Sequence, residues 1–127
     1  MQNDNTKDTP EYKAMADAAI GVLDTRFLKA LTDPTRIQLV KKLILLGACD
    51  VTTISGGLSQ DRSVISRHLN ILEQAGITAS RKDGRRVIYD LDGPYVVQKV
   101  TLILEALRPM ADLCKPFQAI VNKGEVA

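Results

Sequence analysis

The chain is poor in the residues that most often carry catalysis or bind metals. Its 127 residues include one histidine, His68, and two cysteines, Cys49 and Cys114. Two cysteines are too few for a disulfide framework or a four-cysteine zinc site. The sequence has no glycine-rich phosphate loop, no His-Glu pair at metalloprotease spacing and no carboxylate cluster beside a base. These absences argue against an enzyme and predict neither a cofactor nor a metal site.

Long apolar runs are missing as well. The longest, Leu43–Leu46, is far below the ~18 residues that a membrane span needs. The first ten residues are polar and lack the apolar region of a signal peptide. We therefore expect a cytoplasmic protein with free thiols and no membrane partner.

Length and periodicity predict one mainly helical domain. Residues 1–9 have no periodicity and are expected to be a disordered tail, and residues 10–127 a single domain. A second helix, about 34–46, is expected to bury Ile37, Val40, Leu43 and Ile44. A short helix follows, capped by Asp50 or Thr52 and reaching about Ser55. The outer helices are expected at about 11–32 and 95–117, the latter bent by Pro109.

The most informative segment runs from residue 59 to 91. Ile65, Leu69 and Leu72 recur at i, i+4 and i+7, which predicts a helix over about 61–75 with one apolar face. Gly76 follows at the position of a helix-ending glycine. Two strands, about 78–82 and 87–91, are expected on either side of the turn signal Asp83-Gly84. A polar helix followed by a hairpin predicts a winged helix-turn-helix fold.

Positive charge is concentrated in this segment. Residues 59–86 contain six Lys and Arg against three Asp and Glu, whereas the rest of the chain has eleven against twelve. Local charge neutralises DNA phosphates, so double-stranded DNA is the expected partner. The alternative is a winged helix that serves as a protein–protein interaction module. That alternative predicts an apolar or acidic reading face, whereas this one carries Arg62, Arg67, Arg85 and Arg86.

Both outer helices carry apolar stripes. The three inner helices and the hairpin, residues 34–91, are too small to cover both stripes. We expect them to pair across a two-fold axis, giving a homodimer through the N- and C-terminal helices. The alternative is that both stripes close a core within one chain. The expected interface residues are Met15, Ala19, Val22, Val100, Ile103, Leu107 and Met110.

Three segments resemble the ArsR/SmtB family of bacterial winged-helix repressors. Residues 28–43 (LKALTDPTRIQLVKKL) are similar to the family's second-helix signature, 63–77 (SVISRHLNILEQAGI) to its recognition helix and 81–91 (RKDGRRVIYDL) to its wing. The resemblance implies a homodimeric repressor on a palindromic operator. It further implies release from DNA by a metal ion, another inducer or thiol modification.

One departure affects which residues are carried over. Typical members begin this helix at a Leu-Ser-Gln segment, whereas here Asp61 and Arg62 come between Leu58-Ser59-Gln60 and Ser63. Asp61 is therefore the expected cap, and Gln60 lies in a lengthened turn. His68 either reaches a phosphate or packs between helices. The predicted DNA contacts are Gln60, Arg62, Ser63, Ser66, Arg67, His68, Arg85 and Arg86.

The inducer is less defined. The last helix has no histidine and offers mainly Glu105 and Asp112, so the family's zinc site is not expected there. In place of the Cys-Val-Cys step of soft-metal sensors the chain retains one thiol, Cys49. Some members sense oxidants, persulfides or arsenicals through two distant cysteines, which implies Cys49 and Cys114 as a sensing pair. The alternative is that Cys114 packs as a small apolar residue and Cys49 is an incidental loop thiol.

Overall fold

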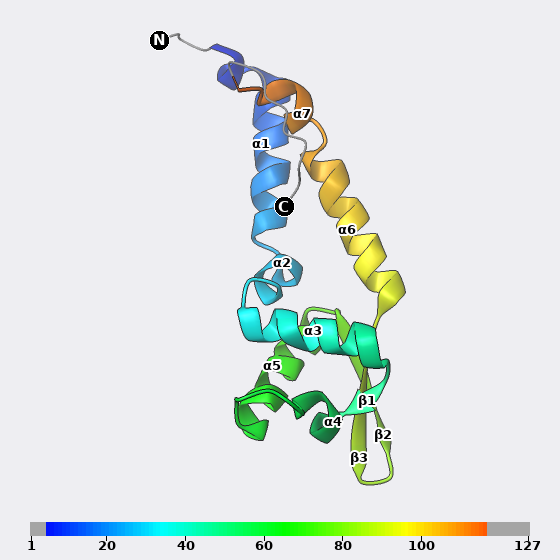
Figure 1. Cartoon of the computed structure of the whole chain (residues 1–127). Helices are drawn as coiled ribbons and strands as arrows, with labels where there is room; N and C mark the ends of the chain where they lie inside the picture. The colour runs from blue at the N-terminus through cyan, green and yellow to red at the C-terminus, as the bar shows by residue number, and fades with distance from the viewer. Residues whose placement is uncertain (1–4, 117–127) are drawn as a thin grey trace. The chain divides into compact units, whose positions relative to one another are not determined.

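The structure is a computed structural model that describes residues 5–116, and its elements divide into two compact units (Figure 1). Residues 23–100 form one unit, which we call the winged-helix body. The described residues 5–22 and 101–116 belong to the other, the terminal unit. No helix within the described residues is long and apolar enough to cross a membrane.

The helices of the body are short and begin at polar caps. They are α2 (Arg26–Ala30), α3 (Pro34–Leu46), α4 (Val51–Ser55) and α5 (Arg62–Gln74). The prediction of one helix over residues 11–32 was wrong, because α1 (Pro10–Leu23) ends before Thr25 and α2 begins after it. Thr25 takes an extended conformation there, and its Oγ1 accepts a hydrogen bond from the Leu28 amide at 3.3 Å. A threonine cap that begins a new helix competes with continuing the old one.

Aspartate caps fix the next two helices at their predicted positions. Asp33 accepts a hydrogen bond from the Arg36 amide at 3.1 Å, with Pro34 as the first residue of α3. Asp50 accepts one from the Thr53 amide at 2.9 Å and is therefore the cap of α4. Both carboxylates satisfy amide groups that the first helical turn leaves without a backbone partner.

A three-stranded antiparallel sheet of order β1-β3-β2 completes the body. Its strands are β1 (Cys49–Asp50), β2 (Thr78–Asp83) and β3 (Arg86–Leu91). Asp83 pairs with Arg86, so the turn residues are Gly84 and Arg85 rather than the predicted Asp83 and Gly84. Gly84 has φ +66°, which a two-residue hairpin turn requires of its first residue. The sequence did not predict β1, whose two residues are too few to show periodicity.

The core of the body lies between α3, α4, α5 and the sheet. Its fully buried side chains are Leu39, Leu43, Ile54, Ile65, Leu69, Leu72 and Ile77. The prediction that Ile44 is buried was wrong, since its side chain is 65% exposed. Leu39 and Leu43 are one turn apart and share the inner face of α3, whereas Ile44 lies about 100° further around the helix.

The terminal unit is built from a few helical segments. They are the 3-10 helix η1 (Asn5–Asp8), most of α1 (Pro10–Leu23), the second half of α6 (Gly93–Leu107) and α7 (Met110–Leu113). The predicted interruption at Pro109 is present, since α6 ends at Leu107 and Pro109 precedes α7. The helix η1 lies within the tail that was predicted to be disordered. The rest of that prediction, residues 1–4, and the predicted helix end at residue 117 lie outside the described residues.

Candidate nucleic-acid interface

Helix α5 separates an apolar face from a basic one. Ile65, Leu69 and Leu72 are fully buried in the body. Arg62, Ser63 and Arg67 are exposed, and Ser66 is half-buried. The residues predicted to read bases therefore lie along the solvent side of the helix, and α5 has the two-sided character expected of a recognition helix.

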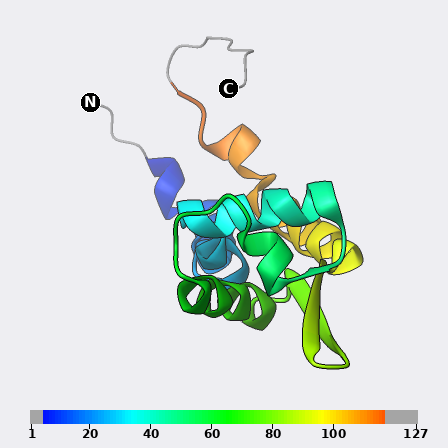
Figure 2. The same ribbon diagram turned by 60° about the horizontal axis from the view of Figure 1, so that its bottom comes forward.

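The first turn of α5 and the tip of the hairpin meet at one hollow. It has a volume of about 290 Å³ and is lined by Arg62 of α5, Arg85 and Arg86 of the hairpin, and four neighbouring residues, Asp50, Val51, Thr52 and Val87. Both views place α5 and the hairpin tip on the same side of α3 (Figure 2). Three arginines from segments more than twenty positions apart thus border one concave surface, which an anionic group can enter.

The three arginines differ in what they contact. Arg86 lies 3.3 Å from the Asp50 carboxylate and 3.4 Å from that of Asp83. The side chains of Arg62 and Arg85 have no hydrogen-bond or ion-pair partner within the described residues. Arg86 is therefore held against the body, while Arg62 and Arg85 keep all their donors available. Sequence reasoning missed Asp50 as the residue that positions Arg86.

Asp50 stays ionised because of its place at a helix start. The hydrogen bond from the Thr53 amide lowers the pKa of the Asp50 carboxyl, and the positive charge of Arg86 lowers it further. The same carboxylate caps α4 and fixes the wing arginine, so it joins the helix–turn–helix to the hairpin.

Gln60 and His68, two predicted contacts, are turned towards the body. Gln60 donates a hydrogen bond from Nε2 to the Thr35 hydroxyl at 2.9 Å. His68 Nδ1 lies 3.2 Å from the Arg36 guanidinium and 3.9 Å from the Asp33 carboxylate. Both residues join the α5 region to the start of α3. Of the two roles considered for His68, packing between helices matches this placement, and phosphate contact stays an untested prediction.

The two cysteines are free and occupy different units. Cys49 is half-buried in β1, where it pairs with Tyr89, and Cys114 is exposed after α7, with its Sγ 3.7 Å from the Tyr12 hydroxyl. Burial raises the pKa of the Cys49 thiol, and the negative charge of Asp50 raises it further. A raised pKa lowers the thiolate fraction at neutral pH, and the thiolate is the reactive form.

The predicted interface residues differ in exposure. Met15 is 5% exposed within the single chain, whereas Val100 and Met110 are exposed. Ala19, Val22, Ile103 and Leu107 are half-buried. The predicted residue Val100 shares an exposed stripe of α6 with two residues that were not predicted, Val97 and Leu104, at i, i+3 and i+7. The stripe most open to a partner is thus offset from the predicted one.

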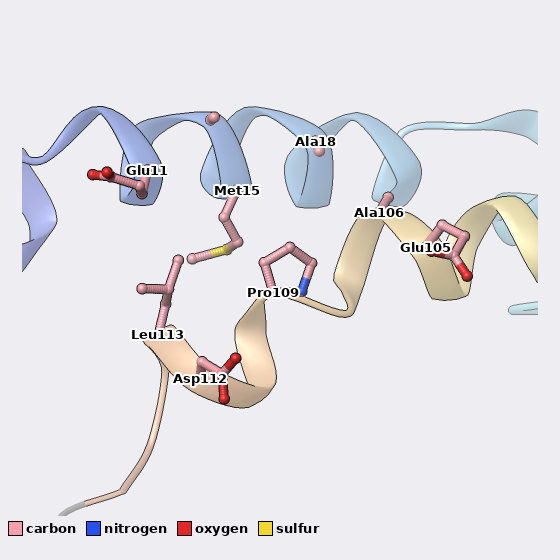
Figure 3. A pocket seen from close by; sticks show the side chains of 9 residues that line it. Glu11, Met15, Ala18, Glu105, Ala106, Pro109, Asp112 and Leu113 are labelled. Atoms are coloured by element: carbon pink, nitrogen blue, oxygen red, sulfur yellow. The ribbon is translucent and has the colours of Figure 1, made fainter.

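The terminal unit contains a cavity of about 510 Å³ next to α1 and α7. Met15, Pro109 and Leu113 face one another across it, and Glu11, Glu105 and Asp112 stand at its border (Figure 3). Glu105 is paired with Arg108 at 3.2 Å. Among residues 5–116, no group of three or more His, Cys, Asp and Glu side chains is arranged to hold a metal ion.

Comparison with known proteins gives a consistent result. Residues 33–79 match the family model described as bacterial regulatory protein, arsR family. A Staphylococcus aureus homologue of the cadmium resistance transcriptional regulatory protein CadC is 35% identical over 59% of the chain, and the match spans 62% of that relative. The arsenical resistance operon repressor of Escherichia coli is 34% identical over 68% of the chain and 74% of the repressor.

Solved structures agree with the fold. The crystal structure of a possible transcriptional regulator for arsenical resistance is similar with a TM-score of 0.55 and 36% identity. The similarity covers 67% of this chain and 93% of that one. The family match includes α3, α4 and α5, which carry the buried core of the body. The chain therefore belongs to the arsR family of bacterial regulatory proteins.

Proposed function

We propose that this transcriptional regulator is a homodimeric repressor that places α5 in the major groove of its operator and the β2–β3 hairpin over the adjacent backbone. The observation that carries the proposal is the hollow where Arg62, Arg85 and Arg86 converge. DNA presents phosphates beside the groove that a recognition helix enters. A helix and a wing whose arginines border one hollow can therefore contact the same segment of the DNA backbone.

The contacts of these residues suggest different roles. Arg62 and Arg67 are exposed on α5, and a guanidinium there has the length and the two parallel donors to bond guanine O6 and N7. Arg85 lies at the hairpin tip, where phosphate or the minor groove is within reach. Arg86 is bound to Asp50 and Asp83, and we assign it the role of fixing the wing.

Self-association is supported by the apolar side chains that one chain leaves open. Ile20 and Leu23 of α1 and Val97, Val100, Leu102 and Leu104 of α6 are more than half exposed. Apolar side chains that recur along one exposed helix face, as Val97, Val100 and Leu104 do on α6, are typical of an interface. A two-fold dimer presents two recognition helices to successive major grooves, which favours a palindromic site.

The experiment is fluorescence anisotropy with a fragment of the protein's own promoter, titrated at several salt concentrations. Arg62→Ala and Arg67→Ala should each weaken binding by about 1–3 kcal/mol and relax the preference for the site over other DNA. Arg85→Ala should weaken all sequences alike and reduce the salt dependence.

Lys13→Ala is the matched control, because it removes one exposed positive charge from α1. Normal binding by both α5 variants, or an equal loss in the control, would contradict this placement of the helix.

A further inference from the structure

A second basic hollow lies in the body, away from the hairpin tip. It has a volume of about 260 Å³ and lies between α2, the first turn of α3 and the end of α5. Arg26, Lys29 and Arg36 line it, and no acidic residue does. In both overall views α2 lies apart from the tip of the hairpin.

The remaining lining residues give this hollow an apolar side. Ala30 is 2% exposed, Ala75 is 4% exposed, and Ile71 and Gln74 come from the last turns of α5. The side chains of Arg26 and Lys29 are exposed and have no hydrogen-bond or ion-pair partner in the described part of the chain. Two available cations beside an apolar wall match a molecule with one anionic and one apolar end.

We propose that this hollow binds a small organic carboxylate and that its occupancy lowers the affinity of the repressor for DNA. The inference rests on the proposed function, because it names the class of effector for that regulator. The volume is below the ~300–1000 Å³ typical of pockets for drug-sized ligands, so the ligand is about the size of benzoate.

Arg36 links the hollow to the recognition helix. Its Nε donates to the Ala30 carbonyl at 2.7 Å, and its NH1 lies 3.2 Å from His68 Nδ1 on α5. A carboxylate at Arg36 competes for the guanidinium that contacts His68, and the same ligand touches Ile71 and Gln74 of α5. Binding in the hollow thereby acts on the helix that carries Arg62 and Arg67. By thermodynamic linkage, bound DNA lowers the affinity for the carboxylate by the same factor as the bound carboxylate lowers the affinity for DNA.

A DNA phosphate is the competing ligand for any basic hollow in such a protein. Arg62 and Gln74 are the two ends of α5, about 18 Å apart at 1.5 Å per residue. The hollow thus lies at the opposite end of the recognition helix from the basic concavity assigned to DNA. An apolar wall also adds nothing to the binding of a bare phosphate.

The test is calorimetric titration of the full chain with benzoate, with its neutral isostere benzamide and with inorganic phosphate. Benzoate should bind at least about tenfold more tightly than either of the others. The double variant Arg26→Gln, Lys29→Gln should lose at least about tenfold in benzoate affinity, whereas Lys41→Gln on α3 should not. In anisotropy, benzoate should raise the apparent Kd for promoter DNA in the wild type and not in the double variant.

Three results would overturn the inference. One is equal binding of benzamide, and another is the absence of benzoate binding by a protein that binds its promoter. The third is a double variant with weakened DNA binding in the absence of benzoate, which would assign the two cations to the DNA backbone. Calorimetry needs no DNA, so a failure of the proposed function itself remains distinguishable.

Discussion

The winged-helix body and the terminal unit bury their apolar side chains to very different degrees. In the body seven large side chains are fully buried, contributed by α3, α4, α5 and the residue before β2. In the described part of the terminal unit Met15 alone is buried, and α6 has no buried residue along its whole length. Apolar residues recur at helical spacing in both regions. In the body other elements of the same chain bury these residues, whereas in the outer helices the single chain leaves most of them exposed or only half-buried.

The contrast indicates how the molecule divides its tasks. A core completed within one chain keeps α5 and the hairpin in fixed register, which sequence reading requires. The outer helices expose apolar side chains to water in one chain. Covering these side chains with a partner surface is favourable, because burial of apolar surface drives association. Under the proposed function, the body presents the residues that read DNA, and the outer helices of two copies set the distance between the two recognition helices.

The largest expected effect is on the core of the body. Leu69→Ala removes a fully buried side chain from α5 and should lower the free energy of unfolding by about 2–5 kcal/mol. Urea denaturation monitored by circular dichroism measures it. Leu45→Ala is the matched control, since that side chain is 82% exposed and its loss should change stability by less than about 0.5 kcal/mol. Equal effects would remove the distinction between a closed core and an open surface.

The second prediction concerns the open stripe of α6. Leu104 is 51% exposed in one chain, so Leu104→Asp should leave helicity unchanged while it weakens the dimer about 100-fold, or about 2.7 kcal/mol. Sedimentation velocity over a range of concentrations measures the dissociation. Gln98→Asp places the same charge at an exposed polar position of α6 and serves as the control. A wild-type monomer at micromolar concentration would contradict self-association through this stripe.

A smaller effect is expected from acid, and it should be confined to the body. Backbone hydrogen bonds from Arg36 and Thr53 lower the pKa of Asp33 and of Asp50 in the folded state. The unfolded chain then binds more protons just below pH 4, so this stabilisation is complete above the ordinary aspartate pKa and is lost as the pH falls. Urea midpoints from pH 6 to pH 3 should fall less in Asp33→Asn, Asp50→Asn than in Asp17→Asn. An identical slope would mean that the caps contribute nothing to acid sensitivity.

The smallest effect compares one thiol from each unit. Cys49 should react with iodoacetamide more slowly than Cys114, because Cys49 is half-buried with a raised pKa and Cys114 is exposed. Mass spectrometry of timed samples measures both rates. If the pair senses oxidants as predicted, diamide should release DNA from the wild type and not from Cys49→Ser, Cys114→Ser. Release from both proteins would leave the thiols without a sensing role.

Several local features could be predicted because short-range chemistry determines them. The capping hydrogen bond of Asp33 marks the start of α3, and the positive φ of Gly76 marks the end of α5. Asp61 stands at the predicted start of α5 in an extended conformation, although its side chain makes no capping hydrogen bond.

The turn at Gly84-Arg85 lies one position beyond the predicted Asp83-Gly84, whereas the break before α2 at Thr25 was not predicted at all. The apolar stripe of residues 11–32 continues across Thr25, so only the hydrogen bond from the Leu28 amide to the Thr25 hydroxyl locates the break, and only the strand register locates the turn.

The sequence by itself determined the family, the order of α3, α4, α5 and the hairpin, and the basic exposed face of α5, because motifs, periodicity and local charge follow from residues close together in the chain. Only the tertiary structure decided which arginines meet, that Asp50 holds Arg86, and that Gln60 and His68 turn towards α3. The three side-chain contacts, of Asp50 with Arg86, Gln60 with Thr35 and His68 with Arg36, join residues 25 to 36 positions apart. No local preference encodes such pairs, since they depend on how the helices and the sheet pack around one core.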